Sequence, residues 1–560
     1  MNKKCQYLLI LPLLFGLVFS AGCSAVRIDS IPPLSGSAQE TSASGVLHQY
    51  SAEDVDDSWN AAGATKITFA AHSVSVSGRG AVSDGSLVTI SDAGTYILSG
   101  STDNGQVLVY AGKNDLVRLV LNGLDITCGD SAPIYIMKAG KTVMILASGT
   151  ENTVMDATAY ARADAAGEPN AAVFSKDDLT ITGNGSLVVT ANYEDAICSK
   201  DILTITGGNI HITAADDGLR GTDGVAILDG TFDIRAGSKG IRSTKDAETS
   251  AEDVTSETEE SVEQGFVLID GGVIHISECT EGIEAPRIEI SGGTIDIEAS
   301  DDAINAAGSS SAGEQFPQGG RGRPAGDWAG GERRPGETGA MPPDQQPGEW
   351  MEGDFAAGDY YLRITGGRIN LFGRNDGIDA NGNVYIEGGE VFISSKSMGA
   401  DGAIDVDESV TITGGSLITA GSIVIPAANS TQASILVSHT AQQAQGSVIA
   451  LKDATGKTIL EYASRITFSA SAFSSPDLKV GETYTLYIDG QKLTDITLTN
   501  LATTISDDGG AYSMTNGFGG GFGGGRNRQA EAGGRTGGQG AAPGRQAPAD
   551  AIDAGKEPAQ

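Results

Sequence analysis

A short phrase of sequence recurs about every 22 residues through the middle of the chain, and this period limits the possible folds more than any other feature. Two successive copies read LTITGGNIHITAADDGL from Leu203 and VAILDGTFDIRAGSKGI from Val225. A fixed period of this size indicates an architecture in which one structural unit stacks on the next. Further copies begin at Leu179, Val267, Ile288, Leu362, Val384 and Val410.

Each copy predicts two short β-strands that meet at a glycine corner. In the copy from Leu203, apolar and polar residues alternate on both sides of the Gly207-Gly208 pair. Alternation of this kind places the apolar side chains of both strands on one face. Two strands cannot bury that face alone, so the copies have to stack, and copies in the same order stack in parallel. The sequence therefore predicts an all-β fold, a parallel β-helix whose coils are completed by a third side containing an acidic turn.

Two other repetitive all-β folds fit the period less well. A β-propeller blade needs four strands and about 40 residues or more. An up-and-down barrel needs a hairpin between successive strands, and Asn-Gly turns do not recur at the required places.

The repeat also divides the chain into segments. We expect the β-helix to occupy residues 65–432, with disordered inserts at 246–264 and 309–359 whose composition is acidic or rich in Gly and Pro. Alternating strands with Gly and Pro turns over residues 433–505 predict a small β cap on the last coil. The Gly-rich residues 506–560 predict a disordered tail.

The N-terminus has the features of an export signal. Residues 1–22 contain two lysines, a hydrophobic run from Tyr7 to Phe19 and small residues before Cys23, which together predict a signal peptide. The Ala-Gly-Cys ending resembles a bacterial lipobox, which implies lipidation of Cys23 and a lipid-anchored protein on the extracellular face of the cell membrane. A plain signal peptide with an incidental cysteine is the alternative. Residues 23–64 then form a tether rich in Ser, Ala, Gly and Pro.

Charge excludes one class of partner. The 560 residues include 36 Lys and Arg against 72 Asp and Glu, a formal net charge of −36 at pH 7. So much negative charge repels a phosphate backbone, so we expect no nucleic-acid binding. The remaining cysteines, Cys128, Cys198 and Cys279, match no zinc or disulfide spacing and are expected to pack as small apolar residues.

Aligning the copies places carboxylates above one another. Adjacent coils lie about 4.8 Å apart, and two carboxylates at that distance repel by about 0.9 kcal/mol in water and about 3.5 kcal/mol at an effective dielectric constant near 20. Ca²⁺, which accepts six to eight oxygen ligands in a loose geometry, would relieve this repulsion. The alternative is a set of solvated turn acids on an acidic protein. The candidate metal ligands are Asp195, Asp201, Asp216, Asp217, Asp223, Asp301, Asp302, Asp376 and Asp379.

The third coil reverses the sign of these columns, because Lys239 and Lys245 replace the acids beside an arginine column of Arg220 and Arg242. These cations could form ion pairs across coils with the acids at 217 and 223, or they could make a cationic notch for an acidic sugar. A third interpretation is catalytic, because a lysine near calcium is a plausible proton acceptor from C5 of a uronate.

Three aromatic residues, Phe372, Tyr385 and Phe392, occupy outward strand positions on the late coils. They could stack on the apolar faces of sugar rings, or they could pack beneath the 309–359 insert. Other catalytic motifs are missing: no Ser-His-Asp arrangement, metalloprotease motif or P-loop is visible in the sequence.

Several longer phrases resemble a family of exported bacterial proteins described as carbohydrate-binding. They include GTYILSG (94–100), LVLNGLDIT (119–127), NAAVFSKDDLTITGNGSLVV (170–189), EDAICSKDILTITGG (194–208) and SSPDLKVGETYTLYIDG (474–490). The resemblance implies a right-handed parallel β-helix with bound calcium, similar to β-helical pectate lyases, and binding to cellulose and acidic plant polysaccharides. It maps the calcium ligands onto Asp195, Asp216, Asp217, Asp223, Asp301, Asp302, Asp376 and Asp379. The chain departs from this pattern at Lys239 and Lys245.

The resulting hypothesis is a monomeric surface lipoprotein whose calcium-bearing β-helix binds acidic or plant cell-wall polysaccharide without turning it over. Arg220, Arg242, Phe372, Tyr385 and Phe392 are the candidate sugar contacts. The first alternative is a pectate-type lyase that uses Ca²⁺ and a lysine base, for which Lys200, Lys239 and Lys245 are the candidates. The second alternative is an adhesin or a structural spacer of the cell envelope.

Overall fold

The computed structural model describes residues 47–71, 73–163, 167–244, 265–308, 360–395 and 402–510. The signal peptide, Cys23, Lys245, both predicted inserts and the chain after residue 510 lie outside these ranges. The chain divides into two compact units, Met1–Gln49 and Tyr50–Gln560, and the second contains every helix and strand described below. No helix in the described ranges is long and apolar enough to cross a membrane.

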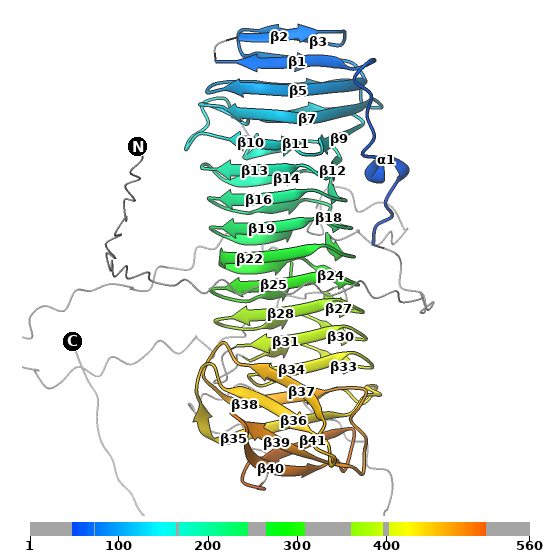
Figure 1. Cartoon of the computed structure of the whole chain (residues 1–560), viewed down its shortest axis with the longest axis vertical. Helices are drawn as coiled ribbons and strands as arrows, with labels where there is room; N and C mark the ends of the chain where they lie inside the picture. Colours follow the sequence, from blue (N-terminus) through cyan, green and yellow to red (C-terminus); the bar gives the residue numbers. More distant parts are fainter. Residues whose placement is uncertain are drawn as a thin grey trace, which may run out of the picture. The chain divides into compact units, whose positions relative to one another are not determined.

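Strands dominate the second unit and stack coil upon coil (Figure 1). Each regular coil has three strands, so the third side, which we expected to contain a turn, is itself a strand. We name the three resulting ladders face 1, face 2 and face 3. Face 1 consists of β9 (Lys141–Leu146), β12 (Leu179–Gly183), β15 (Ile202–Ile205), β18 (Gly224–Ile227), β21 (Phe266–Ile269), β24 (Arg287–Ile290), β27 (Tyr361–Ile364), β30 (Asn383–Ile386) and β33 (Ser409–Ile412).

Faces 2 and 3 are built in the same way, each with parallel pairing between equivalent strands of successive coils. Face 2 consists of β10 (Glu151–Met155), β13 (Ser186–Ala191), β16 (Asn209–Ala214), β19 (Thr231–Ala236), β22 (Val273–Cys279), β25 (Thr294–Ala299), β28 (Arg368–Gly373), β31 (Glu390–Ser394) and β34 (Ser416–Ala420). Face 3 consists of β6 (Gln106–Tyr110), β8 (Ile134–Lys138), β11 (Ala171–Ser175), β14 (Asp195–Ser199), β17 (Leu219–Gly221), β20 (Lys239–Ser243), β23 (Glu281–Glu284), β26 (Ile304–Ala306), β29 (Ile378–Ala380) and β32 (Ile404–Val406).

The core runs through the centre of the coils as stacked aliphatic columns. On face 1, equivalent isoleucines pair directly from coil to coil, for example Ile205 with Ile227 and Ile364 with Ile386, and all four are fully buried. This register explains why the repeat keeps its spacing: a shift of one residue would turn the buried column outward. Cys128, Cys198 and Cys279 are buried free thiols, as the sequence predicts. Cys279 belongs to the central core, whereas Cys198 packs in a separate small cluster with Ala132, Ala171 and Phe174.

Glycine pairs form the corner between faces 1 and 2 because the coils approach closely there. A Cβ atom on Gly366 would lie 2.0 Å from the carbonyl oxygen of Ser291 in the preceding coil. Its neighbour Gly367 has φ +85°, a backbone conformation that L residues rarely adopt. Both members of the pair are therefore required, one for space and one for backbone geometry.

The first coils are less regular. β1 (Thr65–Ala70) pairs in parallel with β5 (Gly94–Thr102) and antiparallel with β2 (Ser73–Ser77), which lies at the end of the stack. β3 (Ala81–Asp84) and β4 (Leu87–Ile90) begin face 3 as an antiparallel pair. β7 (Leu116–Thr127) is long enough to pair with both β9 and β10, so it continues through the corner without a glycine pair.

At the other end, antiparallel strands terminate the parallel stacking. β38 (Phe468–Ser474) pairs antiparallel with β34 and with β35 (Ser434–Gln443), and β41 (Ala502–Ser506) pairs in parallel with β35. A separate four-stranded sheet contains β36 (Val448–Lys452), β37 (Thr458–Ala463), β39 (Thr483–Ile488) and β40 (Gln491–Thr497). These strands share a second hydrophobic cluster around Phe468 and Phe473, which covers the last coil.

The segment from Tyr50 to Ser58, which we expected to belong to the tether, packs against face 1. It contains helix α1 (Ala52–Val55), which lies beside β12 (Figure 1). The buried carboxylate of Asp54 accepts a hydrogen bond from Thr180 and lies 2.6 Å from Nζ of Lys141. Burial opposes the charge of Asp54, but these contacts and those from Ser51 outweigh it and lower its pKa.

We predict that Asp54→Ala weakens the attachment of this segment by about 3 kcal/mol, because the change leaves Lys141 and Thr180 without their shared partner. Glu53→Ala is the matched control, since Glu53 lies on the exposed side of the same helix and should cost less than about 0.5 kcal/mol. Amide hydrogen exchange of residues 51–56 measures the difference. Equal exchange rates in the two variants would contradict the prediction.

Candidate functional site

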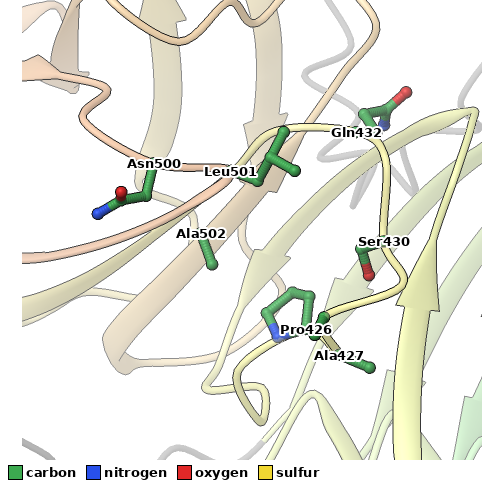
Figure 2. A pocket seen from close by; sticks show the side chains of 8 residues that line it. Pro426, Ala427, Ser430, Gln432, Asn500, Leu501 and Ala502 are labelled. Carbon is green, nitrogen blue, oxygen red and sulfur yellow. The ribbon is translucent and has the colours of Figure 1, made fainter.

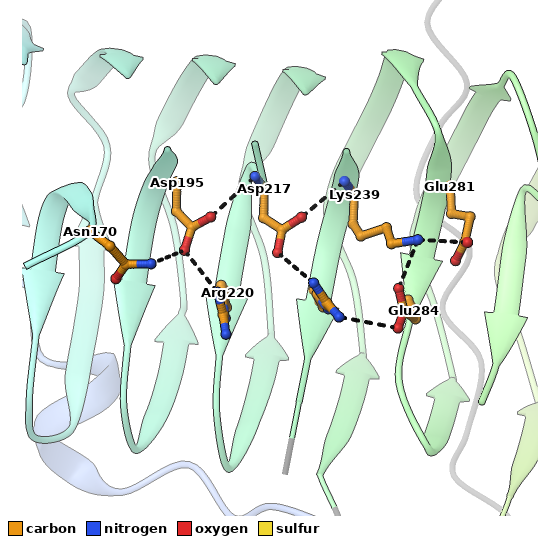
Figure 3. Close-up of polar contacts among 8 residues, drawn as sticks. Asn170, Asp195, Asp217, Arg220, Lys239, Glu281 and Glu284 are labelled. Carbon is orange, nitrogen blue, oxygen red and sulfur yellow. Dashed lines mark hydrogen bonds and ion pairs between the residues drawn. The ribbon is translucent and has the colours of Figure 1, made fainter. Parts of the chain in front are cut away.

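Carboxylates on face 3 accept hydrogen bonds from backbone N–H groups of the next coil. Oδ1 of Asp195 accepts a hydrogen bond from the amide N–H of Asp217 at 3.2 Å, and Oδ1 of Asp217 accepts one from the N–H of Lys239 at 3.0 Å. Figure 3 shows these residues in a row along the stacked strands. The same contact recurs later, where Oδ1 of Asp302 accepts from the N–H of Asp376 at 2.8 Å. Part of the acidic column thus has a structural purpose that needs no metal.

Two arginines form ion pairs with the aspartates in the first part of this column. Nη1 of Arg220 lies 3.3 Å from Oδ2 of Asp195, and Nη1 of Arg242 lies 3.4 Å from Oδ2 of Asp217. Asn170 also donates to Oδ2 of Asp195 at 3.2 Å. Cross-coil ion pairs therefore form, which is one of the interpretations that the sequence left open, and Arg242 pairs with Asp217.

Three carboxylates in this region form what we name group 1: Asp195, Asp216 and Asp217, each with a ligand atom within 4.8 Å of the others. Burial, followed by repulsion from Asp217, raises the pKa of Asp195 to about 7. Burial and the charge of Asp217 also raise the pKa of Asp216. The arginines and backbone donors already occupy the oxygens of Asp195 and Asp217, so group 1 has less capacity for a cation than its carboxylate count indicates.

Lys239 interrupts the acidic column and pairs with the glutamates of the following coil. Its Nζ lies 2.6 Å from Oε1 of Glu281 and 3.0 Å from Oε2 of Glu284, and Arg242 lies 3.6 Å from the other oxygen of Glu284 (Figure 3). Burial works against the charge of Lys239, but the two glutamates outweigh it and raise the pKa of the amine. Lys239 is therefore held as a cation at neutral pH.

A second set of carboxylates follows Lys239, and we name it group 2: Glu281, Asp301 and Asp302, again with ligand atoms within 4.8 Å. β23 supplies Glu281, and the turn before β26 supplies the two aspartates. Burial, opposed by Lys239, raises the pKa of Glu281. Burial and the charge of Asp301 raise the pKa of Asp302 to about 6. Group 2 differs from group 1 because, among the described residues, no arginine forms an ion pair with its carboxylates.

Asn305 and Asp379 extend group 2 along face 3. Nδ2 of Asn305 donates to Oε2 of Glu281 at 3.3 Å, while its Oδ1 is buried and accepts no hydrogen bond from the described residues. Asp379 pairs with Asn305 in register, and burial together with Asp405 and Asp407 raises its pKa to about 6. A buried carbonyl oxygen without a donor, placed among carboxylates, matches the oxygen ligands that Ca²⁺ prefers.

Of the remaining predicted acids, Asp201 and Asp223 lie apart from both groups, whereas Asp376 bonds to Asp302 of group 2 through its backbone N–H. The backbone N–H of Asp223 donates to the carbonyl oxygen of Asp201 at 3.2 Å. Both residues follow the C-terminal ends of face 3 strands, whereas group 1 lies at the N-terminal ends. Asp376 is buried, and its carboxylate accepts from the N–H of Gly402. Lys200, the first candidate base, lies 3.0 Å from Glu168, which also pairs with Lys176.

Residues of the cap cover two of the predicted aromatic residues, so that Phe372 is buried and Phe392 is half-buried. Phe372 is 8% exposed, because Arg465 from the cap lies over its ring, 5.1 Å from the centroid, while pairing with Asp296 and Glu298. Phe392 packs against Tyr462 of the cap, with ring centroids 5.6 Å apart. The cap hairpin therefore covers both rings on face 2. Tyr385 lies on face 1, where it remains half-buried.

A Ser-His-Asp arrangement does form in the folded chain, although none is visible in the sequence. Nδ1 of His439 lies 3.3 Å from Oδ2 of Asp507, and Nε2 lies 2.9 Å from Oγ of Ser471. All three residues are buried, and burial lowers the pKa of His439. A nucleophile must reach its substrate, so this constellation is a buried polar network of the cap and not an open active site.

The cleft in Figure 2 also lacks catalytic groups. It has a volume of 320 Å³ and lies between the loop after the last coil and the loop before β41. No titratable side chain lines it. Its lining residues are Pro426, Ala427, Ala428, Ser430, Gln432, Asn500, Leu501 and Ala502.

Sequence reasoning missed Glu281 and Asn305 as site residues. Glu281 does fall in the aligned acidic column. The sequence alone could not show which of the neighbouring acids pairs with Lys239. Asn305 follows Asp302 by three residues, as Glu284 follows Glu281 and Arg220 follows Asp217. This constant spacing, which places each residue in the adjacent outward column, was the signal that could have identified it.

The fold and these groups define the protein as an all-β solenoid of parallel coils with an acidic ladder along one face. Residues 84–321 match the model of a family described as carbohydrate-binding domain-containing protein. A carbohydrate-binding domain-containing protein of Acetivibrio thermocellus is 42% identical over 128 residues, which cover 23% of this chain and 45% of the relative. The chain thus spans less than half the length of this curated relative.

One solved structure is also similar. It is described as the polysaccharide lyase-like protein from C. thermocellum, in the form of a gadolinium derivative. The sequence identity is 27%, the match covers 62% of this chain and 96% of that chain, and the TM-score is 0.37.

The raised pKa values in group 2 predict a pH-dependent cost in stability. The pKa of Asp302 is about 6 in the folded chain and about 4 in the unfolded chain, so the folded state binds more protons between these values. Stability from this group is therefore lost as the pH rises from about 4 through 6. Asp302→Asn should raise the melting temperature in EDTA at pH 7.5 but not at pH 4, while retaining an acceptor for Asp376.

The control is Asp84→Asn, which changes an exposed carboxylate at the far end of the stack and should not alter the melting temperature at either pH. Thermal denaturation followed by circular dichroism gives the four values. A lower melting temperature for Asp302→Asn at pH 7.5 would show that the hydrogen bonds of this carboxylate stabilise the fold more than repulsion within group 2 destabilises it.

Proposed function

We propose that this chain is a calcium-dependent carbohydrate-binding protein of the cell surface that does not turn over its ligand. The match of residues 84–321 to a carbohydrate-binding family carries the proposal. The proposed ligand is acidic or plant cell-wall polysaccharide, of the pectin or cellulose type. The right-handed winding of the coils, a monomeric state and the absence of nucleic-acid binding belong to the same proposal.

Group 2 is the proposed calcium site. Glu281, Asp301 and Asp302 supply carboxylate oxygens, and Asn305 supplies a buried carbonyl oxygen that has no donor among the described residues. A hard divalent cation would satisfy these oxygens and offset the burial and the repulsion from Asp301 that raise the pKa of Asp302. Group 1 is a weaker candidate, because Arg220 and Arg242 already neutralise two of its carboxylates.

Binding is favoured over lyase chemistry by the state of the lysines. A general base must be unprotonated at the working pH, and the ion pairs of Lys239 raise its pKa. Lys200 is also engaged by a carboxylate, that of Glu168. Lys245, the third candidate, lies outside the described residues.

The binding proposal predicts that the chain is retained on immobilised polygalacturonate or cellulose in CaCl₂ and released by EDTA. The double variant Asp301→Asn with Asp302→Asn should lower calcium affinity by at least about tenfold, since each removes a charge from the ligand set. Asp84→Asn, which changes an exposed carboxylate outside both groups, is the control and should bind calcium and polysaccharide as the wild type does. Calorimetry with Ca²⁺ and a retention assay measure the two effects.

Each alternative has a distinct outcome in this assay. Unsaturated products absorbing in the ultraviolet, formed from polygalacturonate with Ca²⁺, would replace the binding proposal with a lyase. A chain that binds no polysaccharide with or without calcium would favour an adhesin or spacer.

Surface anchoring rests on Cys23 and the lipobox-like sequence before it. Cys23→Ser should move the full chain, expressed in bacteria, from the membrane fraction to the soluble fraction. Cys5→Ser, which changes a cysteine within the expected signal peptide, is the control and should leave the chain with the membranes. Detection of Cys23→Ser in the membrane fraction at the wild-type level would refute lipid anchoring through this residue.

A further inference from the structure

Histidine and aspartate alternate along one outward column of face 2. His211 of β16 pairs in register with Asp233 of β19, and Asp233 pairs with His275 of β22. His275 pairs in turn with Asp296 of β25. These four residues occupy equivalent positions of four successive coils, and we name them the His–Asp column.

Each imidazole in the column uses one nitrogen to pair with the aspartate of the following coil. Nδ1 of His211 lies 3.8 Å from Oδ2 of Asp233, and Nδ1 of His275 lies 3.4 Å from Oδ2 of Asp296. The two histidine side chains are 45% and 47% exposed, and the described residues give Nε2 of neither ring a partner. A histidine with Nδ1 beside a carboxylate and Nε2 available has the arrangement of most metal-binding histidines.

The two aspartates of the column differ in how firmly they are held. Oδ1 of Asp296 accepts a hydrogen bond from Nδ2 of Asn370 at 2.7 Å and lies 3.1 Å from Nη1 of Arg465. Asp233 has only the long contact to His211 within the described part of the chain, and its side chain is 45% exposed. Asp296 therefore orients His275, whereas the carboxylate of Asp233 can move to bind an ion between the two histidines.

Two arginines border the column. Arg465 is already paired with Asp296 and Glu298. Arg235 lies two residues after Asp233 on β19 and is exposed, and its neighbours in register are Thr213 and Ser277. It forms no ion pair with Asp233 in the described ranges. Imidazole ligands are neutral when they bind a metal, so a site of this kind needs only one carboxylate.

The spacing suits one ion bound between the two histidines. Successive coils lie about 4.8 Å apart, so the Cα atoms of His211 and His275 are about 10 Å apart with Asp233 midway. The length of an imidazole side chain and a metal–nitrogen bond of about 2 Å together span half of that distance. The set is more open than groups 1 and 2, whose ligand atoms lie within 4.8 Å, so the exposed imidazoles have to rotate when the ion binds.

We propose that His211, Asp233 and His275 form a binding site for a divalent transition-metal ion such as Zn²⁺. Two imidazoles, one carboxylate and a water molecule are a ligand set that Zn²⁺ uses in proteins. Nitrogen ligands favour Zn²⁺ and Cu²⁺ over Ca²⁺, which prefers oxygen, so this site selects a different class of ion from group 2. It lies on a different face and does not depend on carbohydrate binding.

The test is calorimetric titration of the full chain, produced without a histidine tag, with ZnCl₂ in a buffer that contains CaCl₂. The pH is 8, because a ligating imidazole has to be neutral. The wild type should bind Zn²⁺ at one site in the presence of Ca²⁺. His211→Gln, His275→Gln and Asp233→Asn should each weaken that binding by at least about tenfold, since each removes a ligand.

Thr213→Gln is the matched control. It introduces the same side chain on the same strand as His211, at an exposed outward position beside the column, and should leave Zn²⁺ affinity unchanged. Melting temperatures establish that all variants are folded.

Electron paramagnetic resonance with Cu²⁺ as the probe identifies the ligands directly. The spectrum should show coupling to two nitrogen ligands in the wild type and to one in each histidine variant. If either histidine variant binds Zn²⁺ as tightly as Thr213→Gln does, or if the wild type shows no saturable Zn²⁺ binding, the proposal is overturned. Neither outcome bears on the polysaccharide retention that tests the proposed function.

Discussion

Backbone hydrogen bonds between equivalent strands of successive coils hold this solenoid together and also determine where every side chain lies. Because parallel pairing repeats the same register, a residue at one position of the repeat stands directly beside its counterparts in the adjacent coils. For the aliphatic positions this is favourable, and it produces the continuous isoleucine column of face 1. For the acidic positions the same geometry brings like charges together.

Along face 3, different groups compensate the repulsion between carboxylates in different coils. At group 1, backbone N–H donors and the guanidinium groups of Arg220 and Arg242 compensate the aspartates. In the next coil the column changes sign, and Lys239 binds the glutamates that follow. At group 2, Lys239 pairs with Glu281, but no arginine ion pair is found among the described residues, and Oδ1 of Asn305 accepts no hydrogen bond from them. The absence of an arginine pair and the buried oxygen of Asn305 make group 2 the preferred candidate for a cation site.

The cap has a role beyond covering the end of the core. Its hairpin extends back over face 2, where Arg465 pairs with Asp296 and Glu298 and covers Phe372. Its interior contains the buried network of His439, Asp507 and Ser471. In both cases residues more than 30 positions apart in the sequence come into contact, and a local sequence pattern cannot predict such contacts.

The amino-acid sequence by itself determined the repeat, the parallel stacking of the coils, the glycine corners and the columns of acids, since each depends on spacing that a short period fixes. It also placed Asp195, Asp217 and Asp302 in one column. Only the tertiary structure decided which carboxylates Arg220 and Arg242 neutralise, that Asn305 joins group 2, and that the cap covers Phe372 and Phe392 while Tyr385 stays on another face. The physical reason is that register follows from local periodicity, whereas the pairing of long charged side chains and the path of a non-repeating cap depend on contacts between distant parts of the chain.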